Sequence, residues 1–413
     1  MKTQEREDND FVYDFTSHRI LWMFALVHKS PLFRLANYGY LGILFGLHGY
    51  FLILAVVTIS TIQIKELAVA ASLFVWIALV NVGLLVSRYS SNGCLEDALG
   101  QFQSGVFSYP TREGEDPRGA VTRRVLQVRR VVSYFNKFCY FSGSLNTYFI
   151  PFLAYLKMNP STVDLSQFPL NPYLPLPLVT PFRTDNLPGY LAALFFESLF
   201  MAILWITYMG HQEIFVSVSL QLCGQLELLS ESLESLESRA RSLLHLPPEL
   251  PSDEELYSRP DFQRAMYICF RENVLHHRAI IRLYNQVLPY MESATFFIVF
   301  GFSFLMAVET FIYLQNPQEN VPMLFFLASD LVGLLVMMSA GQMLGDKSLE
   351  LANVLYSTPW TSCDSKFKSM LLIELIRSQQ PLVVKARFFS VEVNLETFAD
   401  IVSAGYKMVN VLR

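Results

Sequence analysis

A stripe of polar residues near the carboxy-terminal end has the most informative chemistry in the sequence. It consists of Glu396, Asp400, Ser403, Lys407 and Asn410. Spacings of 4, 3, 4 and 3 place these side chains on one face of a helix, and its other faces are apolar. A helix over Asn394–Arg413 spans about 30 Å, the thickness of a bilayer's hydrocarbon core. Lipid on all sides would cost about 2.5–3.5 kcal/mol for each charge at the membrane centre, so the stripe must meet water or other polar groups.

Two environments would satisfy this stripe. A water-filled pore would hydrate it directly and make the segment a pore-lining helix. Alternatively, the stripe pairs with polar residues of other membrane helices, for which the sequence offers Asn81, Glu197, Glu309 and Asp330. In both cases Asn394 is a suitable N-cap, because its side chain can accept a bond from a free backbone N–H of the first turn.

Enzymatic signatures are missing from the sequence. It has no phosphate-binding loop, no dinucleotide-binding glycine pattern, no H-E-x-x-H zinc motif and no nucleophile elbow. The five cysteines lack metal-like spacing and are expected to be free thiols, and His276 and His277 fit a solvated helix face. We therefore expect no catalysis, cofactor, metal or nucleic-acid partner.

The composition indicates a protein that crosses a membrane several times. Hydrophobic residues make up 52% of the 413 residues and charged residues only 16%, against about 25% charged in a soluble domain. Six apolar runs are long enough to span a bilayer: Tyr38–Ser60, Leu67–Val86, Val131–Leu156, Tyr190–Val216, Tyr290–Leu314 and Pro322–Leu344. With the carboxy-terminal stretch as the seventh, we predict an all-α membrane protein with seven transmembrane helices.

The distribution of Lys and Arg predicts the topology. Their counts alternate as 5, 1, 7, 2, 7, 0 and 6 along the segments that separate the spans. Since cytoplasmic loops are enriched in these residues, the amino terminus is predicted in the cytosol and the carboxy terminus outside the cell. The expected domains are a cytosolic segment 1–37, spans 1–4 over 38–217, a cytosolic helical linker 218–288, spans 5–6 over 289–345, a cytosolic anchor helix 346–389 and a last span 390–413. The Pro-rich outer segment Lys157–Pro188 is expected to cover the extracellular face.

A leucine repeat follows the fourth span and predicts a long helix. It consists of Leu222, Leu226, Leu229, Leu233 and Leu236. Their a/d spacing continues the membrane helix into the cytosol as an apolar seam, which packs either within the chain or between subunits. A second cytosolic helix is expected over about Asp261–Leu288, and the anchor helix near Asp346–Gln380.

Motifs at the fourth span and near the chain end carry a family resemblance. The first is CGQLELLSESLE at Cys223–Glu234. The closing motifs are Tyr356 with Trp360, Arg377–Ser378 with Pro381, and Asn394–Phe398. These stretches resemble the insect odorant-receptor family, which the first half of the chain matches mainly in hydropathy.

The resemblance implies a subunit of a tetrameric, ligand-gated, non-selective cation channel. The segment Gln221–Leu288 is much shorter than in the family's coreceptor, so the chain resembles an odorant-binding tuning subunit. The implied partners are coreceptor subunits in a heterotetramer, a small apolar odorant and the lipid bilayer, and the implied location is the plasma membrane of a sensory-neuron dendrite. A gustatory-receptor-like channel is the alternative, although that family's T-Y-x-x-x-x-x-Q-F ending is missing. A G-protein-coupled receptor would need the opposite orientation.

The same resemblance implies a ligand pocket in the outer half of the membrane, between the second, third, fourth, fifth and sixth spans. The residues expected there are Phe74, Ile77, Ser144, Thr147, Tyr148, Phe195, Phe196, Met201, Phe325, Phe326 and Ser329. Hydroxyl groups would orient the odorant and the phenylalanines would set the shape of the pocket. For each residue the alternative is packing inside the bundle or contact with lipid.

The implied pore residues lie on two faces of the last helix. They are Asp400, Ser403, Lys407, Met408, Val411 and Leu412. The polar stripe turns Ser403 and Lys407 to water, whereas comparison with the family's constriction favours Met408 and Leu412. Neighbouring residues are about 100° apart around a helix, so Lys407 and Met408 cannot both point at the pore axis.

Overall fold

The fold is helical throughout the part of the chain that the structure describes. The computed structural model describes residues 31–61, 65–90, 92–109, 117–157, 171, 173–176, 178–246, 253–315, 321–388 and 390–412. The backbone there forms helices and connecting segments with one isolated antiparallel bridge, Lys385 with Glu392. Most of the predicted amino-terminal segment 1–37 lies outside these residues. So do six of the predicted site side chains, those of Phe74, Ser144, Thr147, Met408, Val411 and Leu412.

Helices occupy each of the seven predicted positions. The first six are α3 (Pro31–Thr61), α4 (Lys65–Ser90), α6 (Pro117–Ser144) continued by η1 (Leu145–Phe149) and α7 (Ile150–Lys157), α8 (Leu187–Glu234), α11 (Pro260–Gln315) and α12 (Val321–Tyr356). The seventh is α14 (Leu395–Leu412). In the described residues, four stretches meet the length and composition of a membrane span: Tyr38–Thr61, Leu187–Glu234, Pro260–Leu314 and Leu324–Tyr356.

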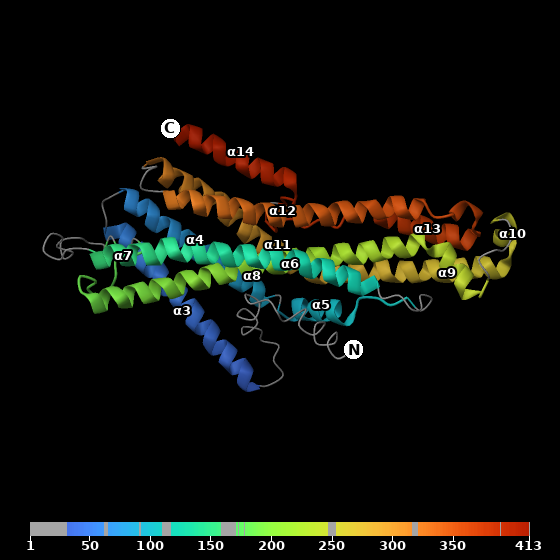
Figure 1. Cartoon of the computed structure of the whole chain (residues 1–413), viewed down its shortest axis with the longest axis horizontal. Helices are drawn as coiled ribbons and strands as arrows, with labels where there is room; N and C mark the ends of the chain where they lie inside the picture. Colours follow the sequence, from blue (N-terminus) through green and yellow to red (C-terminus); the bar gives the residue numbers. More distant parts are fainter. Residues whose placement is uncertain are drawn as a thin grey trace.

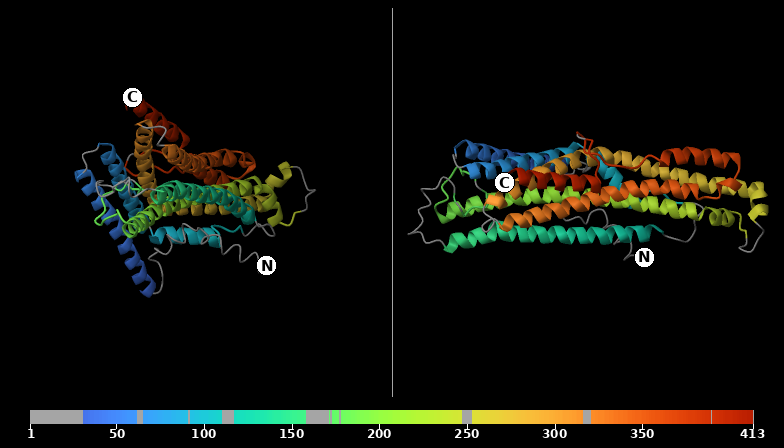
Figure 2. Two further views of the ribbon diagram at one scale, coloured as in Figure 1. Left: turned by 60° about the vertical axis from the view of Figure 1, so that its left-hand side comes forward. Right: turned by 90° about the horizontal axis from the view of Figure 1, so that it is seen from above.

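The long helices run side by side and make the molecule elongated (Figures 1 and 2). Helices α8 and α11 have 48 and 56 residues, which correspond to about 72 and 84 Å. A bilayer core is only about 30 Å thick, so both helices continue far beyond it. Helices α3, α4 and α14 gather toward one end of the bundle (Figure 1). The short helices α9 (Leu236–Leu243), α10 (Asp253–Ser258) and α13 (Ser365–Ser378) lie at the other.

The helix predicted within the linker 218–288 is continuous with the predicted fifth span. The separate helix expected over about 261–288 is the first half of α11, which runs through Pro289. A proline removes one backbone donor from a helix, and here the buried neighbours Val287, Tyr290 and Met291 hold both sides of that position in the core. The membrane bundle and the linker therefore share one unbroken helix.

The predicted anchor helix is broken in two. Helix α12 ends at Tyr356 and α13 starts at Ser365. Pro359 has no N–H to donate and disfavours helix at the residue before it, which explains the break. Asp364 then caps α13, because its side chain accepts a hydrogen bond from Phe367 N at 2.8 Å.

The leucine seam is buried within the chain. Its five leucines are at most 2% exposed and belong to the main hydrophobic cluster together with residues of α11, α12 and α13. Of the two interpretations left open by the sequence, the intrachain one describes these side chains. The cap of α14 is also confirmed, because Thr397 N donates to Asn394 Oδ1 at 2.8 Å.

Candidate ligand-binding and pore-lining sites

Helix α14 presents three different faces. It packs on α11 and α12, with Phe398 and Ile401 turned to the main core. Asp400, Ser403 and Lys407 are exposed, and the helical repeat puts them on the side away from this contact. A third face exposes Val402 and Tyr406. Such a helix has one surface for its own subunit, one suited to water and one suited to an apolar neighbour.

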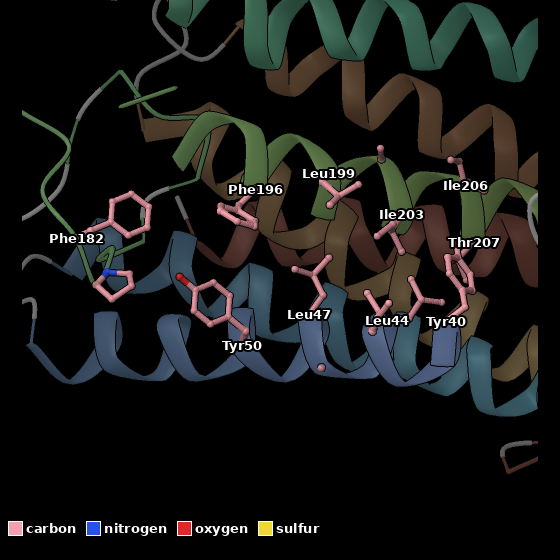
Figure 3. A pocket seen from close by; sticks show the side chains of 14 residues that line it. Tyr40, Leu44, Leu47, Tyr50, Phe182, Phe196, Leu199, Ile203, Ile206 and Thr207 are labelled. Carbon is pink, nitrogen blue, oxygen red and sulfur yellow. The ribbon is translucent and has the colours of Figure 1, made fainter. Parts of the chain in front are cut away.

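A large apolar groove lies between α3 and α8 (Figure 3). Its volume is about 830 Å³, and its lining consists of Tyr40, Ile43, Leu44, Gly46, Leu47, Tyr50, Pro181, Phe182, Phe196, Leu199, Ala202, Ile203, Ile206 and Thr207. The hydroxyl groups belong to the three residues Tyr40, Tyr50 and Thr207. Pro181 and Phe182 close the end near Tyr50 and Phe196 (Figure 3).

The Pro-rich segment before α8 is docked into the same end of the bundle. Leu176 and Leu178 are 1% and 2% exposed, in a cluster with residues of α3, α4 and α8. Leu176 N donates to Glu197 Oε2 at 3.1 Å, and Val179 N donates to Thr58 Oγ1 at 2.8 Å. These two hydrogen bonds tie one segment to α8 and to α3, which form the walls of the groove.

A polar cluster lies where α8, α11 and α12 meet. We define it as Tyr208, Gln212, Glu309, Ser329 and Asp330. Asp330 is close enough to interact electrostatically with both Tyr208 and Glu309. Gln212 Nε2 donates to Gly333 O at 2.6 Å, and a β-carbon at Gly333 would lie only 3.2–3.3 Å from Gln212 Nε2 and the Tyr208 hydroxyl oxygen. Glycine at 333 therefore lets α8 and α12 approach each other at this cluster.

Several polar atoms of this cluster lack a hydrogen-bond partner among the described residues. They are the Tyr208 hydroxyl, Gln212 Oε1 and Glu309 Oε2, and Gln212 and Glu309 are only 1% and 7% exposed. A buried polar atom left unsatisfied costs about 1–3 kcal/mol. A ligand or water that bonds to these atoms would recover that free energy, which makes the cluster a candidate binding site.

The predicted ligand residues are divided among several places. Ile77 and Met201 pack against the cluster beneath the docked segment. Phe196 lines the groove, whereas Phe195 is 64% exposed. Tyr148 lies in a second hollow of about 370 Å³, with Phe141, Leu145, Phe149, Phe152 and Leu194.

The remaining predicted residues lie on α12, where it faces α6. The rings of Phe325 and Phe326 form an edge-to-face pair at 6.1 Å. Phe326 lies beside Gly143 of α6. Ser329 is buried beside the thiol of Cys139 and belongs to the polar cluster. Ser329 thus connects the predicted set with the polar atoms described above.

A π-helical turn interrupts the helix that carries Tyr148. Pro151 follows this turn, and its missing N–H cannot bond the carbonyl of the residue four positions earlier. A wider i→i+5 turn is one way in which a helix accommodates such a loss, and turns of this kind are frequent at functional sites. The sequence contains this signal in the proline.

The sequence analysis did not predict the groove or two of the five residues of the polar cluster. Residues such as Tyr40 and Leu47 belong to apolar runs in which every position looks lipid-facing. Tyr208 and Gln212 did leave a signal, because they stand four residues apart on one face of an apolar span, in YMGHQE.

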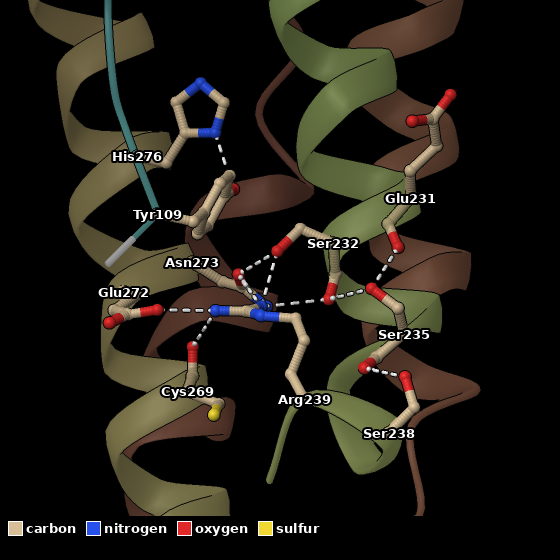
Figure 4. A network of polar contacts seen from close by, with 10 residues as sticks. All are labelled: Tyr109, Glu231, Ser232, Ser235, Ser238, Arg239, Cys269, Glu272, Asn273 and His276. Atoms are coloured by element: carbon tan, nitrogen blue, oxygen red, sulfur yellow. Dashed lines mark hydrogen bonds and ion pairs between the residues drawn. The ribbon is translucent and has the colours of Figure 1, made fainter. Parts of the chain in front are cut away.

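A different kind of polar network holds together the half of the molecule that carries α9, α10 and α13 (Figure 4). Arg239 is 5% exposed, and its guanidinium donates to Ser232 O at 3.1 Å, to Asn273 Oδ1 at 3.0 Å and to Glu272 Oε2 at 2.6 Å. It also lies 4.7 Å from the ring centre of Tyr109. Helices α9 and α11 and the segment after α5 (Asn92–Ser104) are joined through this one side chain.

The described architecture matches known proteins in sequence and in fold. The family described as 7tm Odorant receptor matches residues 106–406. Odorant receptor 9a of Drosophila melanogaster is 34% identical over 98 residues, which are 24% of each chain. Odorant receptor 49a of the same organism is 24% identical over 235 residues, covering 56% of this chain and 54% of that one. The aligned regions thus span from a quarter to just over half of these relatives' length.

Two solved structures share the fold along the whole chain. The olfactory receptor OR5 from the insect Machilis hrabei superposes with a TM-score of 0.73 at 15% identity, covering 98% of this chain and 99% of that one. The same receptor in complex with eugenol gives a TM-score of 0.69 at 16% identity, with the same coverage. At this identity the likeness concerns the fold, while the family match rests on sequence. The chain is a multi-pass membrane protein that belongs to the 7tm odorant receptor family.

Proposed function

We propose that this chain is the odorant-binding subunit of an odorant-gated, non-selective cation channel. It assembles with coreceptor subunits into a heterotetramer in the plasma membrane of a sensory neuron, with the amino terminus in the cytosol and the carboxy terminus outside. Family membership supports the class of ligand, since a receptor of the same fold is known in complex with the small apolar molecule eugenol.

The odorant binds inside the bundle, beside the polar cluster. Ser329 and Tyr208 offer hydroxyl groups, and Phe302 and Phe326 offer aromatic surface nearby. Apolar walls with a few polar groups are typical of small-molecule sites. A ligand opens the channel only through its stronger binding to the open state, and the unsatisfied polar atoms supply a free-energy difference for such binding.

Helix α12 carries the signal from the ligand to the pore. Ser329 and Asp330 lie in its first third, and the same helix packs against α14. A shift of α12 on ligand binding therefore moves the surface on which Phe398 and Ile401 of α14 rest. No long chain of intermediates is needed between the two sites.

The observation that carries the channel assignment is the orientation of α14. Its apolar residues Phe398 and Ile401 face the subunit, while Asp400, Ser403 and Lys407 are exposed on the other side. In a tetramer with this side toward the axis, four such helices enclose a hydrated path. This arrangement favours the polar stripe as the pore face.

Assembly uses a second exposed surface, on α13. Leu372, Ile373 and Ile376 are 60%, 68% and 58% exposed, although α13 belongs to the half of the molecule that lies beyond the bilayer. Contiguous apolar surface of this kind marks a protein contact. We expect it to face the neighbouring subunits of the anchor region.

Cysteine substitution along α14 tests this function. Single cysteines at Asp400, Ser403 and Lys407 are compared with cysteines at the subunit-facing positions Phe398 and Ile401, in cells that express the chain with a coreceptor. A charged methanethiosulfonate reagent applied outside should change the odorant-evoked current only at the first three positions. An equal response at all five, or a response only at Phe398 and Ile401, would exclude the polar stripe as the pore face. Large currents from the chain expressed alone would contradict its role as a subunit that needs the coreceptor.

A further inference from the structure

The groove between α3 and α8 is open to the outside of the bundle. Several of its lining side chains are largely exposed, with Ile43 at 69%, Phe196 at 45% and Leu199 at 43%. In a multi-pass membrane protein such apolar surface is surrounded by hydrocarbon rather than water. A cavity of about 830 Å³ with this lining is therefore filled from the bilayer.

We propose that this groove is a binding site for one acyl chain of a membrane phospholipid. The groove follows α3 from Tyr40 to Tyr50, a rise of about 15 Å. This length equals the depth of one leaflet, about half of the 30 Å core. The occupant is thus a chain that lies along the helices, as lipid chains do in a leaflet.

The lining favours a chain over a small odorant. Sites for small molecules combine apolar walls with polar groups that converge on the ligand and fix its orientation. Here the Tyr50 hydroxyl lies toward one end of the groove, and those of Tyr40 and Thr207 lie at the other. Only apolar side chains line the groove between them (Figure 3). An aliphatic chain satisfies such walls along its full length and needs no polar contact in the middle.

The bound chain affects how the Pro-rich segment docks. Pro181 and Phe182 of that segment close one end of the groove, and its hydrogen bonds to Thr58 and Glu197 attach it to the same two helices. A chain that holds α3 and α8 at a fixed spacing also holds these two anchor points in place. Removing the acyl chain should therefore loosen the docking of the Pro-rich segment on α3 and α8.

Photocrosslinking with a lipid tests the site directly. The full chain, assembled with its partner subunits in phosphatidylcholine nanodiscs, receives a phosphatidylcholine with a diazirine midway along one acyl chain. After irradiation, mass spectrometry locates the adducts. We expect them on the groove walls, around Leu47 and Ile203, several-fold more often than on the exposed face of α6. That face consists of Val131, Tyr134 and Phe138, which are 68%, 69% and 62% exposed.

Two glycines of α3 provide a matched pair of variants. A β-carbon at Gly46 or at Gly42 meets no atom within 4 Å, but only Gly46 lines the groove. Gly46→Phe should therefore reduce the groove adducts several-fold and Gly42→Phe should leave them unchanged. Ala202→Phe fills the groove from α8 and should repeat the effect if Gly46→Phe fails to fold.

Three outcomes would overturn the proposal. The first is an equal density of adducts on α6 and in the groove, which would mean unspecific contact with lipid. The second is an adduct level that neither Gly46→Phe nor Ala202→Phe changes. The third is loss of the groove adducts on addition of octanol while those on α6 persist, which would assign the groove to small apolar molecules.

Discussion

The two halves of the molecule differ in how they hold buried polar groups. In the half that carries α13, the Arg239 guanidinium is surrounded by acceptors from two helices and by an aromatic ring. In the membrane half, Gln212 and Glu309 keep oxygen atoms that have no partner among the described residues. The first arrangement fixes a single geometry, because leaving any member unpaired would be costly. The second leaves hydrogen-bonding capacity for something that is not part of the chain.

The difference assigns separate tasks to the two halves. A network centred on one arginine and joined to a leucine-rich core is suited to a rigid platform. Unsatisfied atoms, a lateral groove and a π-helical turn are suited to a bundle that adapts to ligands. Helices α8, α11 and α12 extend through both halves, so a rearrangement in the bundle acts against a fixed base. The following predictions test this contrast, from the largest expected effect to the smallest.

Thiol reactivity should reveal how tightly the half that carries α13 is packed. Burial raises the pKa of both Cys223 and Cys363 to about 12, while Cys94 is exposed. The thiolate is the reactive form, and a pKa of about 12 in place of about 8.5 lowers its fraction by roughly three orders of magnitude. We expect N-ethylmaleimide to label Cys94 and to leave the two buried thiols unmodified at neutral pH, as measured by mass spectrometry of the intact receptor. Labelling of Cys223 at the rate of Cys94 would contradict a rigid base.

Replacing Arg239 should strongly destabilise the half of the molecule that carries α13. Arg239→Met leaves Glu272 without its partner in a site where the carboxylate is only 12% exposed, and breaking a buried pair costs about 3–5 kcal/mol. We expect a large loss of thermal stability in the purified receptor. Arg241→Met is the control, because Arg241 forms a half-exposed pair with Glu237 on the same helix, worth about 0.3–0.5 kcal/mol. Equal losses of thermal stability in the two variants would show that the network of Figure 4 stabilises the receptor no more than a half-exposed ion pair does.

The sequence predicts the half that carries α13 better than the membrane bundle, for physical reasons. The spacing of Leu222, Leu226 and Leu229 requires a buried helical face, and the structure buries it. Asn394 can cap only the helix that follows it, and it does. Such features depend on a few neighbouring residues. The break after Tyr356 is equally local, because Pro359 has no N–H to donate and disfavours helix at the residue before it.

The groove and the hollows of the membrane half depend instead on how helices diverge. The sequence shows that Leu47 and Ile203 are apolar, but not that α3 and α8 separate enough between them to leave a groove. It also cannot show that Tyr148 faces a hollow shared with Phe141 and Leu194, because that depends on the rotation of the helices about their axes. The predicted ligand residues therefore remain a hypothesis, which variants must test.

A single hydroxyl group tests the bundle at the next level of effect. Ser329→Ala removes a buried hydroxyl of the polar cluster, and a hydrogen bond to an odorant is worth about 0.5–1.5 kcal/mol, or roughly a 2- to 12-fold change in half-maximal concentration. We expect this shift in dose–response recordings with the coreceptor, without a loss of maximal current. Ser303→Ala is the control, since Ser303 is exposed on α11 and bonds only to Val299 of its own helix. Tyr148→Ala should also change potency more than maximal current, and unchanged curves for both variants would move the ligand away from the predicted set.

The smallest effect is expected at Lys407, on the proposed pore face of α14. Lys407 is exposed on the polar face of α14, and a cation there repels permeating cations by about 0.5–1 kcal/mol in a water-filled pore, a factor of roughly 2–5. Lys407→Gln should therefore raise single-channel conductance, and Asp400→Asn should lower it, because the two charges act on the same ions with opposite sign. Lys385→Gln is the control, since that lysine pairs with Glu392 before α14 begins. Opposite shifts at 400 and 407 require both residues to face the same water. If neither changes the conductance, the pore lies on another face of α14 or is formed by the partner subunits, and the polar stripe serves contacts between subunits.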